Sequence, residues 1–222
     1  MTSKYLYRNP DHNFESIHQF DPSRCDEENY YDLYGGIKTP PYVVGGTPIF
    51  NDLDCENIIT LGKRMGCSTG TIGEDNATDG SYRISNISWI SPSQYTSWIF
   101  ERISEVVQNT NHYHYQYKLS RIERIQFTEY KSTENGMYRT HTDPMNWARS
   151  EDRKLSVTIP LVAPEKYEGG QLSLYPTGKE QIVEQKKGTA ILFPSHVVHE
   201  VSPITQGTRY SLVAWVHGPK LS

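Results

Sequence analysis

The chain has 222 residues, with 22 Lys or Arg against 26 Asp or Glu, and a formal net charge of −4. This length fits a single domain, because β-sandwiches and barrels of about 200–250 residues are common, and it suffices to bury a sizeable core. The weakly negative charge, with no basic stripe beyond Lys186-Lys187, counts against binding of duplex nucleic acid. We see no apolar leader and no run of membrane-spanning length, so we expect no membrane partner.

The number and spacing of the cysteines indicate the redox state of the cellular compartment. The three cysteines, Cys25, Cys55 and Cys67, are odd in number and lack metal-ligand spacing. This pattern favours free thiols in a reducing compartment over a disulfide framework. We therefore expect a cytoplasmic protein.

Residues 1–45 differ in composition from the rest. They are rich in Asp, Glu, Asn and Tyr, with Gly35-Gly36 and Pro40-Pro41 as breaks. This pattern predicts an extended N-terminal arm with little regular structure. Its tyrosines are more apolar than a disordered tail needs, so we expect the arm to pack along the domain or along a neighbouring subunit. The second arrangement would hold a homodimer together.

Residues 46–118 read as a helical support. Asn51-Asp52 predicts the cap of a helix that runs through Met65. A loop rich in Gly, Thr and Ser follows at residues 66–81 and is a candidate lid over a site. The apolar positions of this first helix are Leu53, Ile58, Ile59 and Leu61.

A strand at residues 82–90 leads to a second predicted helix. Ser91 is its expected N-cap, with Pro92 in the first turn and Gln94 three residues after the cap. The helix should run to about Asn109 and pack against a sheet. Its apolar positions at helical spacing are Tyr95, Ile99, Ile103 and Val106.

Residues 119–222 read as short strands, several of them separated by glycine-bearing turns. Many short strands at this spacing predict a sandwich or barrel. The expected strands are residues 121–130, 154–161, 171–175, 181–184, 189–193, 197–201 and 208–216.

A metal-ligand pattern lies within these strands. His141 and Asp143 are two residues apart, so on a β-strand both would point to one face, roughly 7 Å apart. His199 follows on a later strand. Two imidazoles and one carboxylate with open coordination positions form the facial triad of non-haem Fe(II) oxygenases. Zinc accepts the same donors, and Thr142 and Pro144 give the pair a turn-like setting.

The last strand carries an arginine where burial is expected. Both faces of residues 209–216 are largely apolar, which is typical of a strand buried on both sides. Arg209 and Ser211 share one face. A buried arginine needs a partner, which the carboxylate of a keto-acid cosubstrate or an internal Glu would provide. This clamp favours iron, because a hydrolytic zinc site would not require it.

Further motifs follow in a fixed order between Tyr82 and Gly218. They are Tyr130, Gly136-x-Tyr138-x-x-His141-x-Asp143, Leu155-Ser156-Val157-Thr158, Glu168-Gly169-Gly170, Phe193-Pro194-Ser195, His199-Glu200-Val201 and Gly207-Thr208-Arg209-Tyr210-Ser211. In order and spacing the set resembles the prolyl 4-hydroxylase-like branch of the Fe(II)/2-oxoglutarate dioxygenases, in particular the PKHD-type hydroxylases. The resemblance implies a mostly β fold with packing helices, a double-stranded β-helix of the cupin-like jelly-roll type. Residues 1–45 match nothing that we can place.

The resemblance also implies roles for single residues. His141, Asp143 and His199 match the catalytic iron ligands, and Arg209, Ser211 and Tyr130 match cosubstrate-binding positions. Substrate contacts would come from Arg83, Tyr138 and Trp215. Core packing is the alternative for the two tyrosines and Trp215, and a surface salt bridge is the alternative for Arg83.

The implied activity is Fe(II)- and 2-oxoglutarate-dependent hydroxylation of an unactivated C–H bond by dioxygen, with ascorbate as a candidate reductant. By analogy the substrate is a prolyl residue of a protein or peptide; a free amino acid or small metabolite is the alternative. A second class of function is a non-catalytic jelly-roll module for metal binding or assembly, against which the complete ligand set and Arg209 count.

Overall fold

The computed structural model describes residues 40–70, 79–143 and 151–220. Contacts group Pro40–Ser222 into one compact unit apart from Met1–Thr39. Most of the predicted arm and the centre of the predicted lid, residues 71–78, lie outside the described residues. Val43–Val44, at the end of the segment predicted as arm, forms strand β1 and pairs with the main sheet. The division of the chain at residue 45 stays a prediction.

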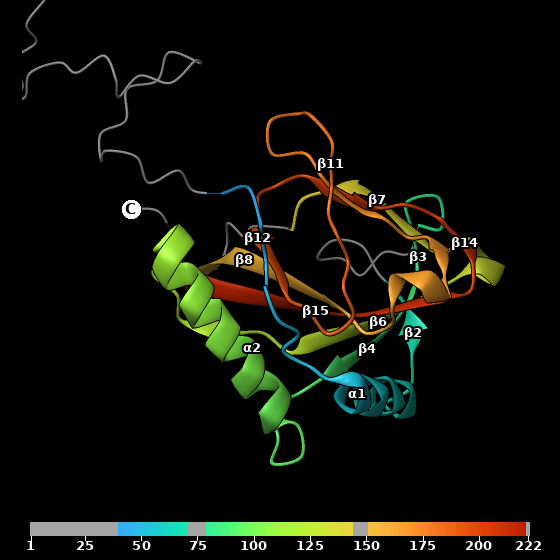
Figure 1. Ribbon diagram of the computed structural model, residues 1–222, viewed down its shortest axis with the longest axis horizontal. Coiled ribbons are helices and arrows are strands. Elements are labelled where there is room, and N and C mark those ends of the chain that lie inside the picture. Colours follow the sequence, from blue (N-terminus) through green and yellow to red (C-terminus); the bar gives the residue numbers. More distant parts are fainter. Residues whose placement is uncertain (1–39, 71–78, 144–150, 221–222) are drawn as a thin grey trace, which may run out of the picture. The chain divides into compact units, whose positions relative to one another are not determined.

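The described residues form two main antiparallel sheets and one two-stranded pair (Figure 1). The larger has the order β1-β12-β8-β15-β6-β4-β2, and β5 also pairs with β15. These strands are β2 (Ser68–Thr69), β4 (Asn86–Ile90), β5 (Arg121–Ile122), β6 (Ile125–Lys131), β8 (Glu151–Pro160), β12 (Ile191–Pro194) and β15 (Thr208–Pro219).

The smaller sheet has the order β11-β10-β13-β7-β3. Its strands are β3 (Arg83–Ile84), β7 (Met137–His141), β10 (Leu172–Leu174), β11 (Gln181–Ile182) and β13 (His199–Val201). A separate pair joins β9 (Glu168–Gly169) to β14 (Ile204–Gln206), and 3-10 turns lie at Ser132–Glu134 and Pro164–Lys166. The architecture confirms the predicted fold class, a jelly roll with packing helices.

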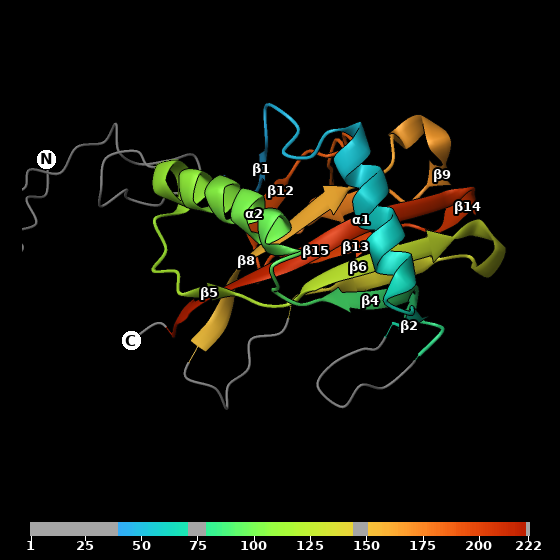
Figure 2. The ribbon, with the colours of Figure 1, turned by 90° about the horizontal axis from the view of Figure 1, so that it is seen from below.

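Helices α1 (Asp52–Arg64) and α2 (Ser97–Thr110) cover one face of the larger sheet (Figure 2). One core cluster fills the space between helices and sheet, and a second lies on the smaller sheet's side. Apolar burial of this kind contributes about 25 cal/mol per Å² of area. None of the helices in the described ranges is long and apolar enough to cross a membrane.

Helix α1 begins where the sequence predicts. The Asn51 side chain accepts from the Asp54 backbone, and the Asp54 side chain accepts from the Asn51 backbone, which is a complete capping box. The predicted apolar stripe was wrong at Leu53, which is 64% exposed. Cys55 and Gly62 are buried in its place, because the closely approaching Phe127 ring leaves no room for a larger residue at 62.

Helix α2 begins at Ser97, so the predicted N-cap at Ser91 was wrong. The Thr96 hydroxyl donates to the Ser91 carbonyl at 2.7 Å, which closes a turn before the helix starts. Tyr95 lies in that turn and is 79% exposed, although we expected it in the core. A π-helical turn at Asn111–Tyr115 continues α2.

The strand predicted at residues 82–90 is divided at Ser85. Strand β3 pairs with β7 in the smaller sheet, whereas β4 pairs with β6 in the larger one. The Ser85 side chain, buried at the break, accepts a hydrogen bond from Arg83 Nε at 2.8 Å. Residues 46–118 therefore supply strands to both sheets in addition to the two helices.

Candidate active site

A cavity of about 690 Å³ lies between the two sheets. Its walls come from β4, β6, β8 and β15 on one side and from β7, β10 and β13 on the other. All nine residues that the sequence singled out line it, namely Arg83, Tyr130, Tyr138, His141, Asp143, His199, Arg209, Ser211 and Trp215.

Strand pairing brings the three candidate metal ligands together. His141 ends β7 and lies opposite His199, the first residue of β13. Asp143 follows two residues after His141, and its backbone N–H donates to the Ser195 carbonyl at 3.0 Å. One donor atom from each of the three side chains lies within 4.8 Å of the other two. Such a cluster can hold a single ion.

The two imidazoles are oriented by backbone carbonyls. His141 Nδ1 lies 2.6 Å from the Arg139 carbonyl, and His199 Nδ1 lies 2.9 Å from the Val197 carbonyl. With both Nδ1 atoms donating, each Nε2 keeps its lone pair for a metal, which is the usual outer support of a histidine ligand. The Tyr138 ring stacks on His141 with centroids 3.5 Å apart.

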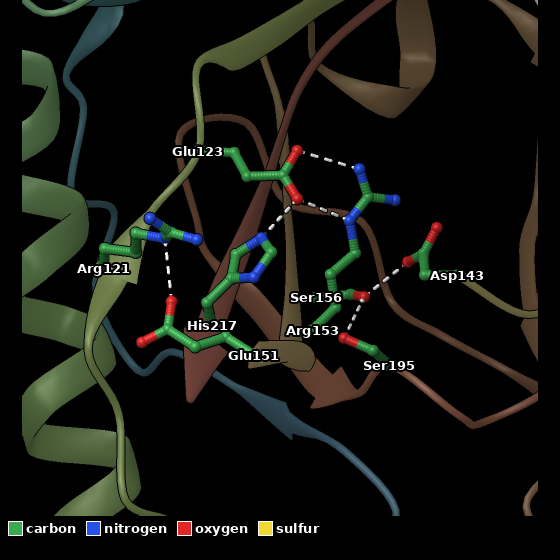
Figure 3. A network of polar contacts seen from close by, with 8 residues as sticks. All are labelled: Arg121, Glu123, Asp143, Glu151, Arg153, Ser156, Ser195 and His217. Carbon is green, nitrogen blue, oxygen red and sulfur yellow. Dashed lines mark hydrogen bonds and ion pairs between the residues drawn. The ribbon is translucent and has the colours of Figure 1, made fainter. Parts of the chain in front are cut away.

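Asp143 is held by hydroxyl groups. Its carboxylate accepts from the Ser156 hydroxyl, and the Ser195 hydroxyl lies 3.0 Å from Ser156 (Figure 3). Burial alone would raise the pKa of Asp143, but His199, His141 and the Ser156 hydrogen bond outweigh it and lower that pKa. Burial, followed by the neighbouring His199, lowers the pKa of His141 to about 3.

At neutral pH these pKa values leave Asp143 ionised and His141 neutral, the forms in which such side chains bind metal. Two imidazoles and one carboxylate suit a divalent iron ion and leave other coordination positions open. The donor set therefore fits Fe(II).

The Arg209 side chain is only 2% exposed. Its Nε and Nη2 donate to Gln185 Oε1 at 3.1 and 2.8 Å, and its Nη1 donates to Ser211 Oγ at 3.2 Å. The Tyr130 ring centroid lies 5.5 Å from the guanidinium carbon. Within the described ranges no carboxylate lies within 4.0 Å of Arg209, so the internal Glu that the sequence left open is not found there.

Arg83 is buried, so it does not lie at the surface, as the salt bridge considered from the sequence required. Its Nη2 donates to Gln126 Oε1 at 2.8 Å, and its guanidinium carbon lies 4.6 Å from the Tyr138 ring centroid. Trp215 is also buried, and its Nε1 has no hydrogen-bond partner among the residues that the structure describes. Both residues stand on the cavity wall.

Sequence reasoning missed a charged group on the same wall (Figure 3). Arg153 donates to both Glu123 oxygens at 2.7 and 2.8 Å, and His217 Nε2 lies 2.5 Å from Glu123 Oε1. The guanidinium carbon of Arg153 lies 3.9 Å from the Trp215 ring centroid. Burial would raise the pKa of Glu123, but the hydrogen bonds from His217 and Arg153 outweigh it and lower the pKa to about 2.

Residues 125–217 match the family model described as the 2OG-Fe(II) oxygenase superfamily. This segment contains the three clustered ligands and Arg209. It belongs to that superfamily. A PKHD-type hydroxylase of Synechococcus sp. (strain JA-2-3B'a(2-13)) is 41% identical over 90 residues, which are 37% of this chain and 39% of that protein. The alignment thus spans well under half of the relative's length.

Two solved structures share the fold over most of the chain. A Trichoplax adhaerens prolyl hydroxylase, in complex with a hypoxia inducible factor peptide fragment, has a TM-score of 0.66 at 19% identity and covers 79% of this chain and 83% of its own. The viral collagen prolyl hydroxylase of Paramecium Bursaria Chlorella virus-1, in its 2OG complex, has a TM-score of 0.60 at 21% identity and covers 83% and 99%. At these identities they establish the shared fold.

Proposed function

We propose that the protein is an Fe(II)- and 2-oxoglutarate-dependent dioxygenase that hydroxylates an unactivated C–H bond. One observation carries the proposal: the clustered His141, Asp143 and His199 share a cavity with the buried Arg209, which is not paired with a carboxylate among the described residues. A metal-binding or assembly module would need the cluster, but it would not need a buried cation beside it.

Each part of the cavity then has a task. His141, Asp143 and His199 would hold Fe(II), while Arg209 and Ser211 would bind the distal carboxylate of 2-oxoglutarate. When bound, the metal and cosubstrate would supply the oxidation, in which substrate, 2-oxoglutarate and dioxygen give the hydroxylated product, succinate and carbon dioxide, with one oxygen atom going to the product and one to succinate. Leu172, Phe193 and Val201 form an apolar part of the cavity wall, which would limit the access of water to the reacting groups.

We propose a prolyl residue of a protein or peptide as the substrate. The support is the names of the two structural neighbours, a prolyl hydroxylase in complex with a peptide fragment and a viral collagen prolyl hydroxylase. The cavity is also large enough to hold a side chain beside the cosubstrate. Arg83, Tyr138 and Trp215 are the candidate substrate contacts. A free amino acid or small metabolite remains the second candidate, because the same cavity volume would accept it.

The first experiment is an anaerobic titration of the purified protein with Fe(II) and 2-oxoglutarate. We expect one Fe(II) per chain and a visible charge-transfer band that needs both additions. Adding dioxygen and candidate peptides should give succinate and a product heavier by one oxygen atom, with ascorbate tested as the reductant. Fe(II) binding without any response to 2-oxoglutarate would favour the non-catalytic module.

For the chain outside the cavity, we propose that the arm docks onto the domain or onto a second subunit, and that the protein acts in a reducing compartment such as the cytoplasm. The support is the composition of residues 1–45 and two unpaired thiols, Cys55 and Cys67. Deleting residues 1–39 should lower the melting temperature or alter the size in solution, while Fe(II) binding persists. An unchanged melting temperature and size would contradict docking.

A further inference from the structure

Gln185 contacts the cosubstrate-binding arginine from outside the cavity. It lies between β11 and β12 and is not among the cavity-lining residues. Its Oε1 accepts two hydrogen bonds from Arg209, from Nε at 3.1 Å and from Nη2 at 2.8 Å. One complete edge of the guanidinium is therefore occupied by a neutral amide.

Hydrogen bonding fixes the orientation of the Gln185 side-chain amide. Gln185 Nε2 donates to the Gly170 carbonyl at 3.0 Å, so its carbonyl oxygen must face Arg209. Gly170 has a φ of +62° and supports the arginine as well, because a Cβ there would come within 2.9 Å of Arg209 Cδ and 2.3 Å of Ile204 Cδ1. The backbone at Gly170 thus fixes both the stem of Arg209 and the amide that holds its head.

Counting donors shows what remains for a ligand. A guanidinium has five N–H groups. Nε and one Nη2 hydrogen donate to Gln185, and one Nη1 hydrogen donates to Ser211. One hydrogen on each Nη therefore remains to donate to a ligand carboxylate. Because Gln185 is neutral, and no carboxylate of the described segments pairs with Arg209, the positive charge of the guanidinium is not compensated there.

We propose that Gln185 is a positioning residue for the cosubstrate: it fixes the Arg209 guanidinium while leaving its charge available to a distal carboxylate. This inference rests on the proposed function. Through Arg209, Gln185 then contributes to the discrimination between a keto acid with a distal carboxylate and one without. A carboxylate at 185 would form an ion pair with Arg209, repel the ligand and lose the hydrogen bond to Gly170.

The test compares two ligands on two variants. The ligands are 2-oxoglutarate and 2-oxopentanoate, which has the same carbon chain without the distal carboxylate. Both are titrated anaerobically into the Fe(II)-loaded full chain, followed by calorimetry and by the charge-transfer band. Gln185→Glu should weaken 2-oxoglutarate binding about ten- to hundredfold, the range for disturbing a hydrogen bond to a charged group, and should leave 2-oxopentanoate binding unchanged. Gln185→Met, which is neutral but has no amide, should give a smaller loss that is again confined to 2-oxoglutarate.

Gln181→Glu is the matched control, since it adds the same charge on β11 and touches none of the cavity residues in the contacts found. It should bind both ligands as the wild type does. Equal 2-oxoglutarate affinity in wild type and Gln185→Glu, or equal losses for both ligands, would overturn the inference alone. A wild type that does not respond to 2-oxoglutarate would overturn the proposed function, and this inference with it. Melting curves with and without ligand check that each variant is folded.

Discussion

Replacing Arg209 by Ala should weaken the binding of 2-oxoglutarate strongly while leaving Fe(II) binding intact. Arg209 is 2% exposed, so its bonds to a ligand carboxylate would form away from water. A hydrogen bond to a charged group contributes about 1.5–3 kcal/mol, and two donors remain for the ligand after Gln185 and Ser211 are satisfied. Losing both would cost about 3 kcal/mol or more. At about 1.4 kcal/mol for each factor of ten, KM for 2-oxoglutarate should rise at least about a hundredfold.

Arg209→Lys should recover part of this loss. An ammonium keeps the charge, but as a compact donor it cannot serve Gln185 and a ligand carboxylate in the geometry of a planar fork. The assay measures succinate formation across a range of 2-oxoglutarate concentrations, with Fe(II) affinity measured separately by anaerobic titration. Fe(II) affinity should change little, because none of the contacts of Arg209 involves the three clustered ligands.

Arg124→Ala is the matched control for Arg209→Ala. It also removes a cavity-lining arginine, but its guanidinium lies 5.1 Å from the Trp89 ring centroid and not beside Ser211. We expect its KM for 2-oxoglutarate to equal that of the wild type. If Arg209→Ala showed an unchanged KM in a folded protein, the cosubstrate would be bound elsewhere in the cavity, and the assignment of β15 to that task would be wrong.

Three further predictions test the site and its support. His199→Ala should abolish Fe(II) binding in equilibrium dialysis. The control variant His196→Ala, which changes an exposed histidine, should bind one ion per chain. Fe(II) binding by both variants would contradict the ligand assignment. Gly62→Ala should destabilise the fold by about 1–3 kcal/mol in urea unfolding, because a Cβ would come within 2.3 Å of the Phe127 ring. Glu123 has a pKa lowered from 4.5 to about 2, so its contribution to stability is present above pH 4.5 and is lost as the pH falls towards 2. Glu123→Gln should lack that acid-dependent loss in melting curves, and an identical acid profile would refute the assigned pKa.

The sequence predicted most of what lies on long, regular strands. Strand β15 is buried on both faces, as the largely apolar residues on its two sides indicate, and Arg209 and Ser211 share the cavity face. The spacing of His141 and Asp143 and their order relative to His199 also pointed to one site. These features depend on local periodicity and on motif order, both of which can be read along the chain.

Other features depend on contacts between distant segments and have no local signal. Gln185 is an ordinary polar residue in a loop until folding places it against Arg209. Glu123 and Arg153 are single charges on separate segments, and nothing in the sequence pairs them. Likewise, the break at Ser85 arises because the residues before it pair with the smaller sheet and those after it pair with the larger sheet. Local periodicity predicts one continuous strand instead.

The pairing of β7 with β13 contains a register shift that changes the direction in which the Tyr138 side chain points. His199 lies opposite His141, and Val201 lies opposite Tyr138, so three steps along β7 match two along β13. In a regular strand residues three apart face opposite sides, yet Tyr138 and His141 stack face to face. The extra residue turns the tyrosine back to the cavity, as β-bulges do. Deleting one residue of this bulge would preserve the ladder of backbone hydrogen bonds and still turn the Tyr138 ring out of the site. The pairing of the two strands therefore does not by itself determine which side chains face the cavity.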